Sequence, residues 1–294
     1  MTTSDYIIHA TAANSTLRAF FAKGTDTVGE AAMIHNTSAL VSAALGRLIV
    51  AGAILGCMQK NDDDLVTLMI RGDGPIGGLV VSSGKDAAVK GYAFNSAAEL
   101  PLNPSGKLDV ALGLGNGALS VIKDIGLKEP VSGQTELVSG EIAEDLTHYF
   151  AYSEQIPSAV ALGVLVDRDY SIKQAGGFLI QLMPGCPDDV VETLEQRLTQ
   201  LGSLTALMDA GKRPEDIMEM VLGGLGCVEI ERHPMRYFCN CDRERVTRAL
   251  ISVGHEELAK MLEEDGGATL HCHFCNTDYH FDHTAVEEIL MLVR

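Results

Sequence analysis

The sequence predicts an α+β protein: a mixed α/β amino-terminal domain with a substantial β-sheet, a helical linker and a small carboxy-terminal zinc-binding module. Three observations support this prediction. Strand signals recur between turn residues in the first part of the chain, amphipathic helical patterns follow, and four cysteines stand in two close pairs near the end. We expect a core domain at 1–183, a metastable helical linker at 184–232 and the zinc module at 233–294.

Length and composition limit the classes of protein that fit. The chain has 294 residues, 46% of them hydrophobic and 21% charged, which is typical of a folded protein with a sizeable core. Its net charge of -18 opposes both the phosphate backbone of nucleic acids and an anionic membrane surface, so we expect neither as a partner. The first residues carry no basic segment followed by an apolar run, and we therefore expect a cytoplasmic protein without a secretory signal.

The amino-terminal domain begins with β signals and continues into a helix. Residues 6–22 suit two short strands joined at Asn14-Ser15. Residues 35–60 then predict one or two helices, with Thr37 or Ser38 as the N-cap. The apolar stretch within them resembles a membrane span, but Arg47 interrupts it, so a buried helix is the better interpretation.

Between residues 65 and 178, most segments favour β-strands. The predicted strands are LVTLMIR, GGLVVSS, VKGYAF, ALSVIKD, QTELVSG, VALGVLV and AGGFLIQLM. Residues 141–155 interrupt them with a helical pattern, which makes the domain mixed rather than all-β. The segment Gly72–Gly77 satisfies G-x-G-x-x-G, but its proline and the strand after it predict a turn rather than a dinucleotide site.

The linker carries two helical patterns. Apolar residues recur every three or four positions from Val191 to Met208, as in an amphipathic helix. Gly202 lies within this pattern and lowers its helix propensity by up to about 1 kcal/mol, so we expect this helix to depend on docking. A second helix is predicted at 214–221, with Pro214 in its first turn.

The strongest chemical signal is the set Cys239, Cys241, Cys272 and Cys275. Two cysteine pairs brought together supply four thiolates, the soft ligands that zinc accepts tetrahedrally, and a closed set leaves no open position for a reacting water. We therefore predict one structural or switch zinc site. The neighbouring histidines are expected to lie outside the ligand set; they are His271, His273, His280 and His283.

The spacing also suggests how such a site responds to oxidants. In extended chain, residues i and i+2 lie about 6.6 Å apart at Cα, so a disulfide within Cys239-Asn240-Cys241 would be strained and reducible. In a module of about 60 residues, zinc can supply on the order of 10 kcal/mol of folding free energy. Oxidation of the thiolates would remove zinc and unfold the module.

Around these cysteines the sequence closely resembles the heat shock protein 33 family of redox-regulated chaperones. The matching stretches are Cys239–Arg245, Glu264–Gly266, Cys272–Asn276, Gly72–Gly77, 133–160 and 175–185, so the resemblance spans nearly the whole chain. It implies a non-enzymatic holdase that binds unfolding client proteins without ATP. It also implies a core domain, a metastable linker and a zinc redox-switch domain.

The resemblance further implies an activation mechanism. The four cysteines would bind zinc in the reduced state. Oxidation would pair Cys239 with Cys241 and Cys272 with Cys275, unfold the linker and promote a homodimer. Three additional thiols, Cys57, Cys186 and Cys227, leave exclusive pairing open.

Two other functions remain as alternatives. Cys272-His273-Phe274-Cys275 is a C-x-x-C pair, which suits a thiol-disulfide oxidoreductase, although that chemistry favours a helix start in a βαβ unit. Arg243, Arg245 and Arg248 follow the first cysteine pair and suit a nucleic-acid-binding zinc ribbon, although Glu244 and the overall acidity oppose it.

Overall fold

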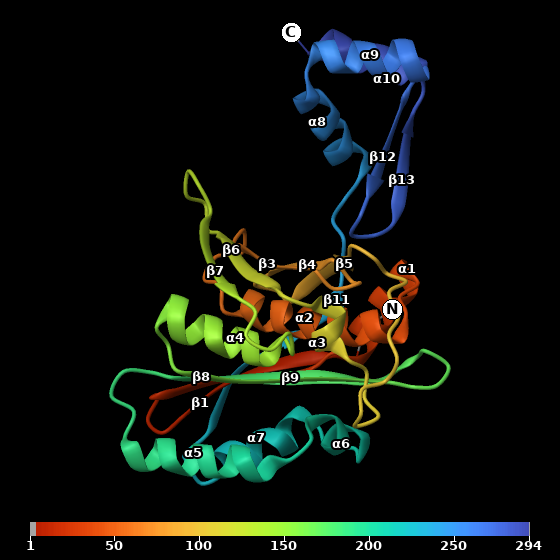
Figure 1. The fold of residues 1–294 in the computed structure, drawn as a ribbon. Coiled ribbons are helices and arrows are strands. Elements are labelled where there is room, and N and C mark those ends of the chain that lie inside the picture. The colour runs from red at the N-terminus through yellow and green to blue at the C-terminus, as the bar shows by residue number, and fades with distance from the viewer. Residues whose placement is uncertain (1–3, 294) are drawn as a thin grey trace. The chain divides into compact units, whose positions relative to one another are not determined.

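The computed structural model describes residues 4–293 and divides the chain into two compact units. The first unit ends at Phe238 and the second begins at Cys239. The first unit stacks two sheets around a central helix, with further helices on the outer face of one sheet (Figure 1). Mixed helices and sheets are present throughout, which confirms the predicted fold class.

The first sheet has five antiparallel strands in the order β10-β1-β2-β9-β8. Its strands are β1 (Tyr6–Ala12), β2 (Leu17–Lys23), β8 (Ser158–Val166), β9 (Ile172–Leu182) and β10 (Val228–Pro234). The predicted hairpin at 6–22 is confirmed, and Ala13, Asn14 and Ser15 make its turn with positive φ angles. Alternate residues of β2 face opposite sides, so Phe20 packs toward the central helix and Phe21 toward the outer helices.

The second sheet has six strands in the order β11-β5-β4-β3-β6-β7. Its strands are β3 (Leu65–Gly72), β4 (Gly78–Gly84), β5 (Ala88–Ala93), β6 (Gly117–Asp124), β7 (Val131–Glu136) and β11 (Arg236–Tyr237). The glycine-rich segment joins β3 to β4 as a turn, as predicted, because Gly77 adopts a φ of 74° and no helix follows. Only the short β11 runs parallel to its neighbour, β5.

The central helix α2 (Ala39–Cys57) lies between the two sheets. Ser38 caps it by accepting a hydrogen bond of 3.2 Å from the Val41 amide, as the sequence predicted. All its residues are buried except Ala39 and Arg47. By length and composition α2 is the one helix of the described residues that could span a membrane, but 94% of its apolar window is buried, as expected of a core helix.

Shorter helices complete the core. They are α1 (Thr25–His35), α3 (Val110–Leu114), α4 (Ala143–Tyr149) and the π-helical turn η1 (Phe150–Glu154). The helical pattern predicted at 141–155 corresponds to α4 and η1. Helix α1 has no counterpart among the predicted elements; it buries only Thr27, Val28 and Ala31, so its hydrophobic periodicity is weak.

Three helices cover the outer face of the first sheet: α5 (Asp188–Leu201), α6 (Leu204–Asp209) and α7 (Pro214–Leu222) (Figure 1). The amphipathic pattern predicted as one helix is broken, because Gly202 has a φ of 73° and Ser203 caps a new helix. The apolar side chains that the helices place on the sheet are Leu194, Leu204, Met208, Ile217, Val221 and Leu222.

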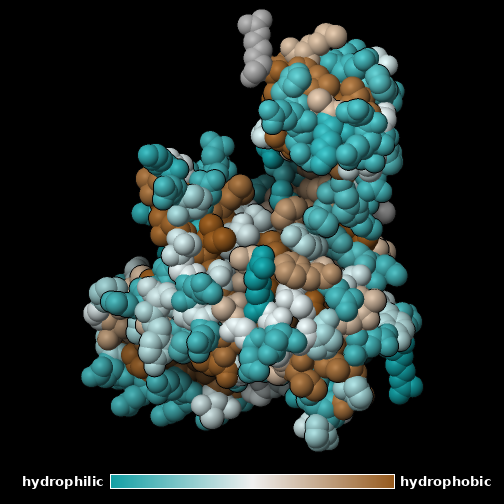
Figure 2. Space-filling model, turned by 45° about the horizontal axis from the view of Figure 1, so that its top comes forward, coloured by the Kyte–Doolittle hydropathy of each residue, from teal (hydrophilic) through white to brown (hydrophobic). Residues whose placement is uncertain are grey.

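The exposed surface of the first unit is mixed in character. On the face in Figure 2, apolar side chains lie in separate patches among hydrophilic ones. The large exposed apolar side chains near β6 and β7 are Ile125, Leu127, Val131 and Val138. By contrast, the apolar side chains beneath α5, α6 and α7 are covered.

The second unit is small. It contains α8 (Arg243–Val253), α9 (His255–Asp265), β12 (Ala268–Cys272), β13 (Thr277–Phe281) and α10 (His283–Leu292). Its buried core consists of Leu250, Leu258, Phe281, Val286 and Ile289. Five buried side chains at about 1.5–3 kcal/mol each provide little against the conformational entropy of more than fifty residues. The unit therefore needs an additional source of stability.

The segment expected to be a linker is docked. Residues 184–232 lie within the first unit, and β10 and β11 continue the chain along its two sheets up to Cys239. The assignment of residues 184–232 to a separate, metastable linker stays a prediction.

Candidate metal centre

The four predicted cysteines come from two separate segments of the second unit. Cys239 and Cys241 precede α8, which Asp242 caps by accepting a 2.7 Å hydrogen bond from the Arg245 amide. Cys272 ends β12, and Cys275 lies in the turn to β13. In that turn Asn276 has a φ of 56° and its amide donates a 2.8 Å hydrogen bond to the Cys272 carbonyl, which folds the second pair back on itself.

The structure brings the four sulfurs together. All four Sγ atoms lie within 4.8 Å of one another, with 3.7 Å between Cys239 and Cys272 and 3.1 Å between Cys241 and Cys275. Tetrahedral zinc with Zn–S bonds of about 2.3 Å requires sulfurs about 3.8 Å apart. The cluster therefore fits a single metal ion with a closed sulfur shell.

Electrostatics favour a cation at the centre of this cluster. Burial raises the pKa of the Cys239 thiol, and the neighbouring Cys241 and Cys272 sulfurs raise it further. Several thiolates in one half-buried site repel one another unless a positive charge lies between them. The donor set thus matches a divalent, sulfur-preferring metal, of which zinc is the usual case in four-cysteine sites.

Hydroxyl groups contact the sulfurs from outside the cluster. The Tyr279 hydroxyl oxygen lies 3.1 Å from the Cys241 Sγ, and the Thr277 Oγ1 lies 3.2 Å from the Cys275 Sγ. The contact with the Cys241 sulfur raises the pKa of Tyr279, which keeps the phenol protonated as a donor. The sequence indicated aromatic residues after the second pair but gave no sign of this contact, because it depends on the β12–β13 register.

The neighbouring histidines lie outside the cysteine cluster. Among residues 4–293 the four cysteines are the one group of three or more Cys, His, Asp or Glu side chains whose ligand atoms approach this closely. His271 Nδ1 lies 2.7 Å from Asp278 Oδ1, and His280 Nδ1 lies 3.0 Å from the Thr269 hydroxyl. These contacts orient the two imidazoles on the strand surfaces.

The other three cysteines lie in the first unit. Cys57 ends the core helix α2, and burial raises the pKa of its thiol to about 12, so it stays protonated. Cys186 and Cys227 are half-buried against the cluster beneath α5, α6 and α7. Burial also raises the pKa of the Cys227 thiol. None of the three joins the four-sulfur cluster.

One internal contact ties the two halves of the second unit together. The Arg243 guanidinium of α8 lies 4.2 Å from the centre of the Phe281 ring and donates a 2.9 Å hydrogen bond to the His280 carbonyl on β13. Arg248, one turn further along α8, forms an ion pair of 2.6 Å with Glu244. Two of the three arginines that suit a nucleic-acid binder are therefore engaged within the unit.

Comparison with known proteins supplies the family. The model of the Hsp33 protein family matches residues 5–282. The chain belongs to the Hsp33 family. A 33 kDa chaperonin of Lachnoclostridium phytofermentans is 50% identical over 98% of each chain, and one of Agathobacter rectalis is 49% identical over 97% of this chain and 99% of that protein.

A solved structure agrees with this assignment. The 33 kDa chaperonin (heat shock protein 33 homologue) of Thermotoga maritima matches with a TM-score of 0.90 and 38% identity over 99% of each chain. The Hsp33 fold thus extends through both units of this protein. The resemblance recognised in the sequence is confirmed.

Proposed function

We propose that this protein is a redox-regulated, ATP-independent holdase that binds unfolding proteins and prevents their aggregation under oxidative stress. Membership of the Hsp33 family and the similarity to proteins named 33 kDa chaperonin support chaperone activity without catalysis. The observation that carries the redox regulation is the four-sulfur cluster, which stands in a unit with only five buried core side chains. A cytoplasmic, reducing compartment suits free thiols in this arrangement.

In the reduced state we propose that Cys239, Cys241, Cys272 and Cys275 hold one zinc ion. Bound zinc would cross-link the two halves of the second unit and supply much of its folding free energy. The Tyr279 hydroxyl would stabilise the Cys241 thiolate by donating a hydrogen bond to it. Arg243 holds α8 against β13.

Oxidation would remove the sulfur ligands. Four thiolates lose four electrons in forming two disulfides, and two molecules of hydrogen peroxide accept these electrons with four protons to give four waters. We propose the pairs Cys239–Cys241 and Cys272–Cys275, which join neighbours in sequence. In the reduced structure all four sulfurs lie within 4.8 Å of one another, so the partners of each proposed disulfide are already neighbours.

Loss of the second unit's fold would then be transmitted along the chain. Cys239 follows β10 and β11 directly, and Arg232 of β10 forms an ion pair of 2.7 Å with Glu215 of α7. We propose that release of this strand undocks α5, α6 and α7. The sheet side chains uncovered would be Ala12, Leu17, Ala19, Phe21, Phe178 and Ile180, a continuous apolar face suited to unfolded clients and to homodimer formation.

A thiol-disulfide oxidoreductase is the alternative function. The C-x-x-C pair lies in the turn of the β12–β13 hairpin, whereas thioredoxin-like catalysis places this motif at a helix start beside a sheet. The structural context therefore favours the metal site over this alternative.

One experiment separates these functions. Aggregation of a heat-unfolded client is followed with the reduced, zinc-loaded protein and with the same sample after peroxide, while zinc release and thiol count are measured in parallel. The holdase predicts protection only after oxidation, together with release of one zinc and loss of four thiols. Equal protection by both forms, or catalysed insulin reduction without protection, would contradict it.

A further inference from the structure

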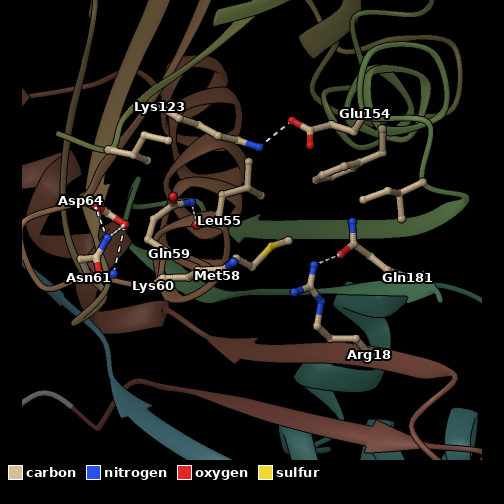
Figure 3. A pocket seen from close by; sticks show the side chains of 13 residues that line it. Arg18, Leu55, Met58, Gln59, Lys60, Asn61, Asp64, Lys123, Glu154 and Gln181 are labelled. Carbon is tan, nitrogen blue, oxygen red and sulfur yellow. Dashed lines mark hydrogen bonds and ion pairs between the residues drawn. The ribbon is translucent and has the colours of Figure 1, made fainter. Parts of the chain in front are cut away.

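A pocket of about 320 Å³ opens in the first unit, beside the carboxyl end of α2 (Figure 3). Side chains from both sheets, from α2 and from η1 line it. The apolar part of the lining consists of Leu55, Met58, Ile125, Phe150 and Ile156. None of these residues belongs to the cysteine cluster or to the segment predicted to undock.

Arg18 of β2 enters this pocket in a fixed orientation. It is paired in register with Gln181 of β9, and its Nη2 donates a 2.5 Å hydrogen bond to the Gln181 Oε1 (Figure 3). Gln181 is fully buried and its amide nitrogen donates to the Ser158 hydroxyl at 3.3 Å. Both ends of the glutamine side chain are therefore used, and the glutamine holds the guanidinium in place.

The charge of Arg18 is not compensated. Among the described residues no carboxylate forms an ion pair with it, and its buried Nε has no hydrogen-bond partner. Burial lowers the pKa of the guanidinium, which nevertheless stays charged. A half-buried guanidinium without a carboxylate partner is costly unless an anion approaches it, and such an anion would meet the terminal Nη groups rather than the buried Nε.

Three of the other charged groups of the pocket, Lys123, Glu154 and Asp64, already have partners, and the fourth, Lys60, is an exposed lining residue. Lys123 lies 2.6 Å from the Glu154 carboxylate, which also accepts a 2.6 Å hydrogen bond from the Tyr149 hydroxyl. Asp64 accepts hydrogen bonds from the backbone and side-chain nitrogens of Asn61. The lining thus carries three cations, Arg18, Lys60 and Lys123, against two carboxylates, Asp64 and Glu154, which leaves one net positive charge within a protein of net charge -18.

We propose that this pocket binds a small monocarboxylic acid with an apolar body. The carboxylate would face Arg18, and the body would pack on Leu55, Met58 and Phe150. The one net positive charge of the lining matches a single negative charge. A phosphate dianion would bring excess charge toward Glu154 and leave the apolar lining without a partner.

The test uses the reduced, zinc-loaded full chain with octanoate as the probe. Methionine methyl groups are labelled with ¹³C, and Met58→Leu identifies the Met58 resonance. We expect a saturable shift of that resonance at one octanoate per chain. Arg18→Gln should weaken binding at least about tenfold, whereas Arg71→Gln, which removes a surface arginine of β3, should leave the affinity unchanged.

Matched ligands isolate the two parts of the site. Octanol and octylamine keep the apolar body without the anionic head, and inorganic phosphate keeps an anion without the body; all three should bind at least about tenfold more weakly. If Arg18→Gln loses the wild-type fold, Arg18→Lys keeps the charge without the planar fork and should bind with intermediate affinity.

Three results would overturn the proposal. The first is equal octanoate affinity in the wild type and in a folded Arg18 variant. The second is octanol binding as tight as octanoate. The third is a set of non-saturating shifts spread over many methionines, which indicates surfactant-like association.

Discussion

The hydroxyl of Tyr6 on β1 donates a 2.7 Å hydrogen bond to the Glu215 carboxylate on α7. Glu215 also accepts from Arg232 of β10 at 2.7 Å, so one carboxylate joins a sheet strand, an outer helix and the strand that leads to the cysteine cluster. Burial and the contact with Glu215 raise the pKa of Tyr6 to about 12, which keeps it protonated as a donor.

We expect Tyr6→Phe to loosen α7 by about 1 kcal/mol, because it removes one hydrogen bond to a charged acceptor and leaves the sheet side chains in place. Amides of α7 should exchange hydrogen faster, and client protection should require less peroxide. Tyr152→Phe is the matched control, since Tyr152 is 73% exposed. Identical exchange in α7 of the Tyr6 variant and the wild type would show that this contact does not hold the helix.

Gly163 on β8 offers a steric test of α6 docking. A Cβ at this position would lie 2.7 Å from the Thr205 Cγ2 of α6 and 3.4 Å from the Met208 Cε. We expect Gly163→Ala to cost about 1–3 kcal/mol of docking free energy and to give partial client protection without oxidant.

A rescue variant and a control variant test whether the effect of Gly163→Ala comes from the contact with α6. Thr205→Ser removes the clashing methyl group and should restore oxidant dependence when combined with Gly163→Ala. Gly29→Ala is the matched control, because nothing lies within 4 Å of its Cβ position. Unchanged protection in Gly163→Ala would mean that α6 can shift without exposing the sheet.

Removal of the metal should unfold the second unit and leave the core of the first unit around α2 folded. Chelation of the reduced protein should abolish hydrogen-exchange protection from residue 239 onward, since the unit has only five buried core residues. The core helix α2 should remain protected. Elemental analysis should find one zinc per chain, and retained protection in α8, α9 and α10 after complete metal removal would refute this account.

The contact between Tyr279 and Cys241 should tune the metal site. Tyr279→Phe removes a hydroxyl 3.1 Å from a ligand sulfur, so we expect zinc affinity to fall by about 10- to 100-fold and peroxide to react faster. A competition titration with a colorimetric chelator measures the first effect, and thiol loss with time measures the second. Tyr170→Phe, in the first unit and 58% exposed, should change neither quantity.

Asp5 should make the first unit less stable as pH rises. Burial raises its pKa to about 6 from 3.8, although the Thr27 amide and hydroxyl both donate to its Oδ2. The folded state therefore binds a proton more tightly than the unfolded state. The stabilisation that protonated Asp5 gives the folded state is complete below about pH 4 and is lost as pH rises through 6. The free energy of unfolding should therefore fall by about 1 kcal/mol between pH 5 and pH 7.

Urea unfolding of the wild type and of Asp5→Asn at these two pH values tests this prediction. Other titrating groups are common to both proteins, so the difference between their pH dependences isolates Asp5. Parallel pH dependences would show that Asp5 ionises normally in the folded protein.

Local sequence signals located much of this structure. The hairpin turn, the capped helix α2 and the four-cysteine cluster follow from neighbouring residues, and each was predicted. The elements that were missed depend on distant partners. The strand β10 has an alternating pattern too weak to stand out, because only His233 is buried, and its place beside β1 is set by long-range pairing.

The pocket at Arg18 could not be predicted for the same reason. Its lining includes Arg18 of β2 and Gln181 of β9, which are more than 160 positions apart in the sequence. The feature that distinguishes the pocket is the lack of a carboxylate beside Arg18, and no local sequence pattern reports it. The break between α5 and α6 was within reach, since Gly202 and Ser203 carry a local stop and cap. Apolar residues continue at helical spacing on both sides of Gly202, and this continuity predicted one helix where the structure has two.

The helices that cover the first sheet are part of the same chain as the face they cover, so under the proposed function they act as a tethered competitor for clients. A short tether gives such a competitor an effective concentration in the millimolar range. A client holds the face only while the competitor is unfolded. Under this proposal, reductant and zinc would restore the second unit, the helices would displace the client by mass action, and the cellular thiol pool would time its release in place of nucleotide hydrolysis.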